Sequence, residues 1–125
     1  PVNPVNFAST LAPNIHIIGD AAIANAMPKS AFSANAQAKL CALQIVRELR
    51  GEAPLESTLI NTCYSLLAPN YGISVAGVYR PGTTALDPVP NSGGTSELNA
   101  PLSTRALEAA YARSWFSKVT KEAFG

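Results

Sequence analysis

The fold is decided by residues 59 to 80, which read LINTCYSLLAPNYGISVAGVYR. Two apolar runs, Leu59 to Leu67 and Tyr71 to Arg80, flank a turn at Ala68-Pro69-Asn70, a pattern typical of an antiparallel hairpin. The second run alternates with the period of a strand, Ile73, Val75, Gly77 and Tyr79 on one face against Ser74, Ala76 and Val78 on the other. Pro81-Gly82 ends that run, and 83 to 89 is predicted to add a third strand, weakened by Pro88.

A helix is predicted on each side of this hairpin. The first runs over about residues 33 to 50, capped by Ser30 or Ser33 and followed by Gly51 as its C′ residue. The last runs over about residues 103 to 123, after a Gly/Ser/Asn-rich loop at 91 to 101. The apolar stripe of the first helix consists of Ala34, Ala38, Cys41, Ile45 and Leu49, and Leu40 and Leu43 widen it. The apolar stripe of the last helix consists of Leu107, Tyr111, Trp115 and Val119. The second stripe is either core or a surface covered by a partner.

Upstream of the first helix, Asn14 to Gly19 (NIHIIG) predicts a short buried strand. One strand followed by one helix cannot make a sheet alone, so this half is predicted to be the tail of a larger α/β domain. We therefore expect an α+β chain. A tail strand and helix occupy residues 1–52, and a small antiparallel sheet with a C-terminal helix occupies residues 53–125.

Composition narrows the possible functions. The 125 residues are 47% hydrophobic and 14% charged, whereas soluble domains average about 25% charged; we expect the chain to bury surface against something else. The chain has nine Lys and Arg against eight Asp and Glu, with no basic block. This charge balance excludes a dedicated nucleic-acid arm and gives no sign of a polybasic membrane anchor. No apolar run approaches the roughly 18 to 20 residues of a membrane span. The chain opens at Pro1 without an initiator Met, so we expect residues before it, and the missing export signal does not indicate a compartment.

The first candidate site begins where the apolar run ends in Gly19-Asp20. A carboxylate at the end of a strand, after a glycine that admits close approach, can accept hydrogen bonds from ligand hydroxyls. The start of the first long helix follows at Met27-Pro28-Lys29-Ser30, where unpaired N–H groups and Lys29 favour negative charge. This pair of features suits a ligand with a polyol chain and a ring that becomes anionic, such as a reduced flavin. An ordinary Gly-Asp turn and a solvated lysine remain the alternative.

The second candidate is Cys63, which lies among polar neighbours in a strand, where a nearby positive charge would make the thiol reactive. Cys41 falls on the apolar face of a helix and is interpreted as a core residue. A Cys41–Cys63 disulfide is the structural alternative for both. His16 has no second ligand nearby, so we expect a core or cap histidine and no metal site.

Several of these segments resemble the flavoprotein subunit of flavocytochrome c sulfide dehydrogenase. The resemblance is carried by Ile15 to Asp20, Met27 to Lys39, Asn61 to Leu66 (NTCYSL), Asn70 to Ala76 and Ser114 to Phe116, and it covers essentially the whole chain in family order. Members belong to the two-dinucleotide-binding-domain flavoproteins. They pass electrons from sulfide through a redox-active cysteine pair to FAD and then to a cytochrome c haem subunit.

The resemblance implies a role for each candidate residue. Gly19, Asp20 and the segment Met27, Pro28, Lys29 and Ser30 would bind FAD, with Asp20 on the ribityl chain and the helix start facing the flavin N1/C2 carbonyl. Cys63 would be one of the two redox cysteines. Residues 1–52 would be the C-terminal segment of the FAD-binding domain, and 53–125 the interface domain of this family.

The family's Gly-rich nucleotide loop, the cysteine that carries FAD and the other redox cysteine precede this region and are not in the sequence. The resemblance therefore implies the C-terminal portion of a periplasmic enzyme, inactive alone, whose substrate is sulfide or another small reduced sulfur species. Two alternatives remain open. One is a flavoprotein of the sulfide:quinone reductase type, and the other is a non-catalytic module that docks a subunit.

Overall fold

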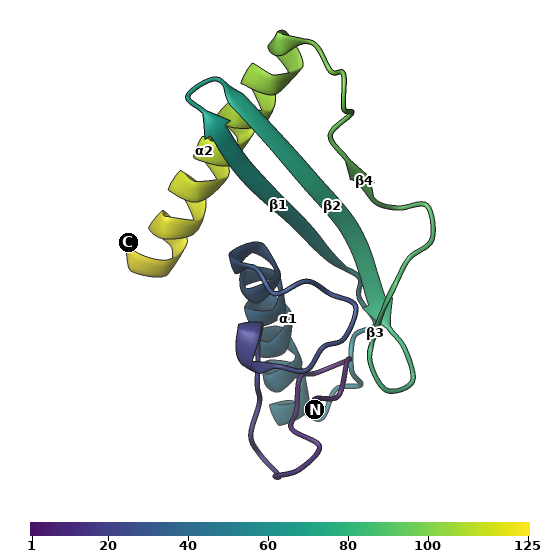
Figure 1. Ribbon diagram of the computed structural model, residues 1–125. Helices are drawn as coiled ribbons and strands as arrows, with labels where there is room; N and C mark the ends of the chain where they lie inside the picture. The colour runs from purple at the N-terminus through teal and green to yellow at the C-terminus, as the bar shows by residue number, and fades with distance from the viewer. The chain divides into compact units, whose positions relative to one another are not determined.

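The computed structural model describes all 125 residues and has the expected α+β composition (Figure 1). Its helices are the 3-10 turn η1 (Gly19–Ala21), α1 (Ala31–Leu49) and α2 (Leu102–Phe124). Its strands are β1 (Leu59–Ala68), β2 (Tyr71–Pro81), β3 (Leu86–Pro88) and β4 (Gly94–Thr95). The predicted α+β class, the hairpin and both long helices are therefore confirmed.

The sheet has the order β1-β2-β3, and β4 also pairs with β2. β3 and β4 are both antiparallel to β2, with Arg80 opposite Asp87 and Val75 opposite Thr95. The third strand is shorter than predicted because a tight turn, in which Gly82 N–H donates to the Ala85 carbonyl at 2.7 Å, occupies its first residues. β4 lies in a segment predicted to be loop, since Gly94-Thr95 has no strand signal of its own.

The chain forms two compact units, each built from separate segments. The first unit contains Pro1–Asn61 and Gly77–Ser92, and the second contains Thr62–Ala76 and Gly93–Gly125. The expected assignment of residues 1–52 and 53–125 to two family domains stays a prediction. Neither α1 nor α2 combines the length and apolar character needed to cross a membrane.

The core of the first unit forms where α1, the N-terminal loops and β3 meet. Phe7 and Leu86 are its most deeply buried large side chains, at 0% and 1% exposed. They pack in one cluster with Met27 of the loop before α1, with Leu40 and Cys41 of α1, and with Leu59 and Tyr79 of the strands.

The buried face of α1 differs from the predicted apolar stripe. Ser33, Gln37, Leu40, Cys41 and Gln44 are buried, whereas Leu49 is 83% exposed and Leu43 is 45% exposed. Gln44 is buried because its amide binds the chain on both sides of it: Nε2 donates to the carbonyls of Val5 and Leu55, and Oε1 accepts from Leu55 N–H. The prediction failed because it assumed that only apolar side chains mark a buried face.

Both ends of α1 are closed as the sequence predicts. Ser30 is the N-cap, and its Oγ accepts from Ser33 N–H at 3.0 Å. At the other end, Gly51 has φ +69°, its N–H donates to the Glu48 carbonyl, and Glu52 N–H donates to the Arg47 carbonyl. These two bonds form a Schellman motif, which requires a residue in the left-handed region.

The buried strand predicted over residues 14 to 19 is wrong. Its chain pairs only locally with the N-terminal loop, through an isolated bridge between His16 and Ala8, and Gly19 begins η1. Ile15 and Ile18 are exposed. With no neighbouring strand among these 125 residues, the segment has no ladder to join, whatever its β propensity.

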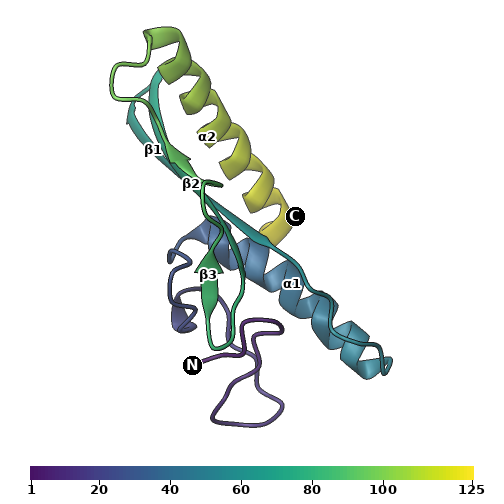
Figure 2. The same ribbon diagram turned by 90° about the vertical axis from the view of Figure 1, so that its right-hand side faces the viewer.

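In the second unit, α2 packs along residues 62–76 of the hairpin (Figure 2). Gly72 permits the close approach, because a Cβ there would lie 2.5 Å from Ala109 N and 2.9 Å from Ala109 Cα. Trp115 is half-buried, with its ring centroid 6.5 Å from that of Tyr64. Leu107 and Tyr111, the first half of the predicted stripe, are exposed.

A polar network ties the 93–101 segment to this unit. Glu108 accepts hydrogen bonds from Ser74, Ser96 and Arg105. Arg105, only 3% exposed, also donates to the backbone carbonyls of Glu97 and Leu98 and lies 5.4 Å from the centroid of the Tyr71 ring. Arg105 Nε has no partner within the chain, but the bonds made by the Arg105 Nη atoms and by Glu108 tie the backbone at residues 97 and 98 and the Ser96 side chain to α2.

Candidate functional site

The first candidate site is the loop from Gly19 to Ser30, which leads into α1. Gly19 has φ +64°, its N–H donates to Gln37 Oε1 at 2.8 Å, and a Cβ there would lie 3.2 Å from Ala34 Cβ. The glycine therefore lets the backbone turn directly against the helix. This contact, and not a strand end, positions Asp20.

Asp20 and Lys29 are brought together at the start of α1. Lys29 Nζ donates to the backbone carbonyl of Asp20 at 2.6 Å, and both residues are exposed. The lysine thus binds the main chain and leaves the Asp20 carboxylate open to solvent. An exposed acceptor beside a positive charge and a helix N-terminus can serve both a hydroxyl chain and an anionic ring.

Met27 and Ser30 make contacts of a different kind. Met27 is 3% exposed and its Sδ accepts from Gln37 Nε2 at 3.5 Å. Ser30 Oγ donates to Asn61 Oδ1 at 2.6 Å while it caps the helix. Both side chains also make contacts within the first unit that hold the loop in place; their expected contact with a cofactor stays a prediction.

The pocket at this loop has a volume of about 230 Å³ and is lined by Gly19, Met27, Pro28, Lys29 and Gln37, with the intervening chain. Sites that enclose a small molecule measure roughly 300 to 1,000 Å³. The hollow at this loop is therefore smaller than a site that encloses a whole small molecule.

Two residues that organise this site were not predicted from the sequence. Asn61 is 1% exposed and accepts from both Ser30 Oγ and Ser33 Oγ. Gln37 contacts Gly19 and Met27. Gln37 lies between two alanines and Asn61 follows Leu59 and Ile60, but the sequence gives no sign of the distant partners that these two side chains bind.

Cys63 lies in β1, in the second unit, and is half-buried. Neither cysteine is part of a disulfide, so the Cys41–Cys63 bond considered as an alternative is absent. Cys41 is buried in α1, and burial raises the pKa of its thiol. A thiol with a raised pKa is less often a thiolate, so Cys41 is suited to packing and not to nucleophilic chemistry.

The second unit carries an apolar pocket of about 360 Å³, which is lined by Tyr64, Leu66, Trp115 and Phe116, with Ala112 and Arg113. Tyr64 follows Cys63 in β1. A hollow walled by aromatic rings accommodates planar apolar groups.

His16 makes only a backbone bridge, and its buried Nε2 has no hydrogen-bond partner within the chain. No group of three or more His, Cys, Asp or Glu side chains gathers where a metal ion could bind.

The Gly19–Ser30 loop carries an exposed carboxylate and a lysine at the start of α1, and the second unit separately carries an aromatic hollow. Residues 56–124 match the family model described as flavocytochrome c sulphide dehydrogenase, flavin-binding. The match spans more than half of the 125 residues, and the chain belongs to this family. Its cofactor is accordingly FAD, and the resemblance read from the sequence is confirmed. Cys63 lies inside the matched region, whereas the loop from Gly19 to Ser30 precedes it.

Proposed function

We propose that this chain works as the C-terminal portion of an FAD-dependent sulfide dehydrogenase flavoprotein, which passes electrons from sulfide through a cysteine pair and FAD to a cytochrome c subunit. The observation that carries the proposal is the family match over residues 56–124, which includes Cys63 on β1. The polar and aromatic groups described above support it.

When bound, FAD would accept an electron pair from the sulfur of a cysteine. Asp20 is the residue to hold its ribityl hydroxyls, because the Asp20 carboxylate is open to solvent while Lys29 binds the Asp20 carbonyl. Lys29 and the N-terminus of α1 would favour the negative charge of the reduced ring, and such charges contribute about 0.3 to 1 kcal/mol each at an exposed helix end. Gly19 and Pro28 complete the contact surface, and Met27 and Ser30 hold the loop.

Cys63 is the proposed sulfur centre, paired with a cysteine of the flavoprotein outside these 125 residues. Sulfide attacks that disulfide, a new S–S bond forms as the old one breaks, and the products are a persulfide on one cysteine and a thiolate on the other. Cys41 is a poor candidate for the second cysteine, because it is buried and its pKa is raised.

Exposed apolar side chains support the view that this chain acts within a larger flavoprotein. Leu43, Val46 and Leu49 are exposed along α1, and Leu107 and Phe116 along α2. Soluble proteins expose few such groups together unless another surface covers them. We propose that the remainder of the flavoprotein and the cytochrome c subunit pack against these exposed side chains. The assembly is proposed to be periplasmic. The isolated chain is expected to be inactive.

The test uses the full-length flavoprotein with Cys63→Ser, and Cys41→Ser as the matched control. Without oxygen, sulfide is mixed with each protein and the loss of the oxidised flavin absorbance is followed. Cys63→Ser should keep its flavin spectrum and lose sulfide-dependent reduction by at least a hundredfold, whereas Cys41→Ser should reduce its flavin like the parent.

The acceptor is identified in the same experiment by adding a c-type cytochrome or a soluble quinone after reduction. Reoxidation by cytochrome supports the proposal, and reoxidation by quinone alone would favour the sulfide:quinone reductase type. A Cys63→Ser protein with full turnover would remove Cys63 from the mechanism. A full-length protein that purifies without flavin would leave the subunit-docking alternative.

A further inference from the structure

A buried polar cluster of Ser30, Ser33 and Asn61 joins the start of α1 to β1. Ser33 and Asn61 are each 1% exposed, and Ser30 is half-buried. Asn61 Oδ1 accepts a hydrogen bond from Ser30 Oγ at 2.6 Å and another from Ser33 Oγ at 2.9 Å. One amide oxygen therefore receives both hydroxyl protons, and this fixes the direction in which each hydroxyl group points.

The direction of the Ser30 hydroxyl determines how the helix is capped. Because Ser30 Oγ donates its proton to Asn61, its lone pairs are left to accept from the Ser33 N–H at 3.0 Å. The Ser30 carbonyl accepts in turn from the Ala34 N–H at 2.9 Å. Asn61 thus holds the residue on which the first turn of α1 is built.

The cluster does more than helix capping requires. A serine N-cap satisfies a first-turn N–H group by itself, and the other polar groups of a helix end are commonly satisfied by water. Burying an amide and a hydroxyl carries a desolvation cost, which their hydrogen bonds offset. The cluster gains a fixed geometry in return, because a satisfied polar network specifies one arrangement. That arrangement ties the helix start to a strand that is distant in the sequence.

The charged groups proposed to face the flavin adjoin this cluster. Lys29 precedes Ser30 in the chain, and Lys29 Nζ donates to the Asp20 carbonyl at 2.6 Å. Movement of Ser30 would therefore move both the ammonium group and the positive end of the helix dipole. Polar groups that are held in place before a charge develops stabilise that charge better than groups that must first reorient.

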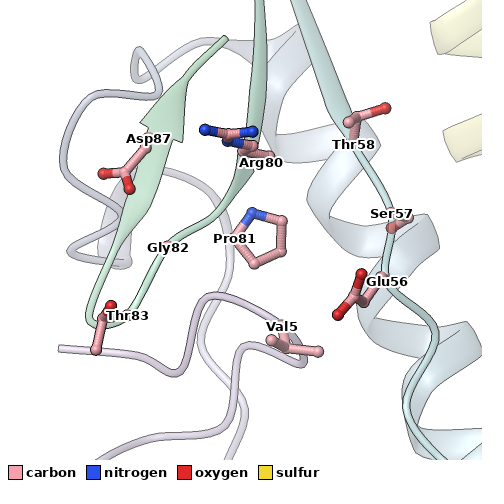
Figure 3. A pocket seen from close by; sticks show the side chains of 9 residues that line it. All are labelled: Val5, Glu56, Ser57, Thr58, Arg80, Pro81, Gly82, Thr83 and Asp87. Carbon is pink, nitrogen blue, oxygen red and sulfur yellow. The ribbon is translucent and has the colours of Figure 1, made fainter.

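The largest pocket of the first unit, of about 940 Å³, contains none of the three cluster residues. Three charged side chains line it, Glu56, Arg80 and Asp87 (Figure 3). All three are exposed, so water solvates them. The polar groups of the Asn61 cluster differ from this solvated surface, because they are removed from water and held by the fold.

We propose that Asn61 is a positioning residue of the flavin site. It fixes Ser30 and the first turn of α1, and through them Lys29, in the place from which their positive charge favours the reduced flavin. Since Asn61 is 1% exposed, it acts through Ser30 and not by contact with the cofactor. This inference rests on the proposed function, because it takes the flavin to lie at the start of α1.

The first experiment measures amide hydrogen exchange by NMR in the 125-residue chain without flavin. Asn61→Leu keeps a side chain of similar size and removes the acceptor. Exchange should become at least tenfold faster at Ser33 and Ala34, whose N–H groups donate to Ser30. Unchanged exchange at these two amides would overturn the inference, whatever the flavin does.

Gln44→Met is the matched control for this experiment. It also removes a buried amide of the first unit, 3% exposed, but one whose bonds go to the backbone of Val5 and Leu55. Its effect on exchange should be confined to those contacts and should leave the first turn of α1 protected as in the parent. A general loss of stability would instead raise exchange alike in both variants.

The second experiment measures the midpoint potential of the flavin in the full-length flavoprotein. Asn61→Leu should lower the equilibrium constant for flavin reduction about threefold, which is about 14 mV for a two-electron couple. Gln44→Met should leave the potential unchanged. A residue that served only the stability of the fold would not move the potential.

Asn61→Asp provides a second variant that remains informative if Asn61→Leu does not fold. It keeps an acceptor oxygen for both serine hydroxyls, so exchange at Ser33 and Ala34 should match that of the parent. Its negative charge beside the start of α1 opposes reduction, so the flavin potential should fall at least as far as in Asn61→Leu. A potential equal to that of the parent would show that the flavin does not lie near the cluster and would overturn the inference.

Lys29→Met distinguishes a failure of this inference from a failure of the proposed function. If Lys29→Met lowers the potential and Asn61→Leu does not, the flavin lies at the start of α1 and the positioning role of Asn61 alone is refuted. If neither variant moves the potential, the placement of the flavin at this loop is refuted, and the inference is refuted with it.

Discussion

Gly72→Ala should destabilise the second unit severely. A methyl group at this position would lie 2.5 Å from Ala109 N, 2.8 Å from the Glu108 carbonyl carbon and 2.9 Å from Ala109 Cα. All three are backbone atoms, so no side chain can rotate away. Because non-bonded carbons pack best at about 3.5 to 4.0 Å, α2 would have to retreat by about 1 Å along this contact. Overpacking of this kind costs about 1 to 3 kcal/mol, and we expect the upper half of that range.

The assay is equilibrium unfolding in urea, followed by the fluorescence of Trp115, which is the sole tryptophan and packs against Tyr64 in this unit. Gly94→Ala is the matched control, since a Cβ at position 94 meets nothing within 4 Å, and its effect should stay within about 0.5 kcal/mol. Adding Ala109→Gly to Gly72→Ala should not restore stability, because the collision is with backbone. A loss below about 0.5 kcal/mol for Gly72→Ala, or rescue by Ala109→Gly, would refute the reasoning.

Three further predictions concern single side chains. Ser30→Ala removes the N-cap of α1 and the bond to Asn61; it should lower the free energy of unfolding by about 1 kcal/mol, measured in urea. Hydrogen bonds, chiefly from Ser96, lower the pKa of Glu108 below its usual 4.5. The stability that the ionised Glu108 contributes is therefore present above pH 4.5 and is lost as the pH falls through the pKa of Glu108 in the folded state. Glu108→Gln should therefore flatten the loss of stability between about pH 5 and pH 3. Iodoacetamide should alkylate Cys63 well before Cys41, whose burial raises its pKa; peptide mass mapping would reveal the reverse order.

Local signals were sufficient to predict the hairpin and both long helices. The alternation around Ala68-Pro69-Asn70 and the Ser30 and Gly51 caps act within a few residues, and the structure contains them where predicted. The segment 14–19 shows the limit of such signals. β-Branched residues make a strand only when a neighbouring strand supplies the hydrogen bonds.

The candidate site was predictable in part for the same reason. The closeness of Asp20 and Lys29 follows from a short loop before a helix, and the hydrogen bond between them bears this out. The supporting roles of Gln37 and Asn61 depend on contacts between distant parts of the chain. A polar residue on a helix or strand gives no sign in the sequence of the partner that will satisfy it when it is buried.

The interleaving of the two compact units has a practical consequence. The polypeptide leaves the first unit after Asn61, returns at Gly77 and leaves again after Ser92. Any single cut therefore divides the chain of at least one unit, and neither can be excised as one contiguous peptide. Truncation libraries aimed at a minimal fragment should give only insoluble or molten products, and a graft of either unit would have to carry the strands it shares with the other.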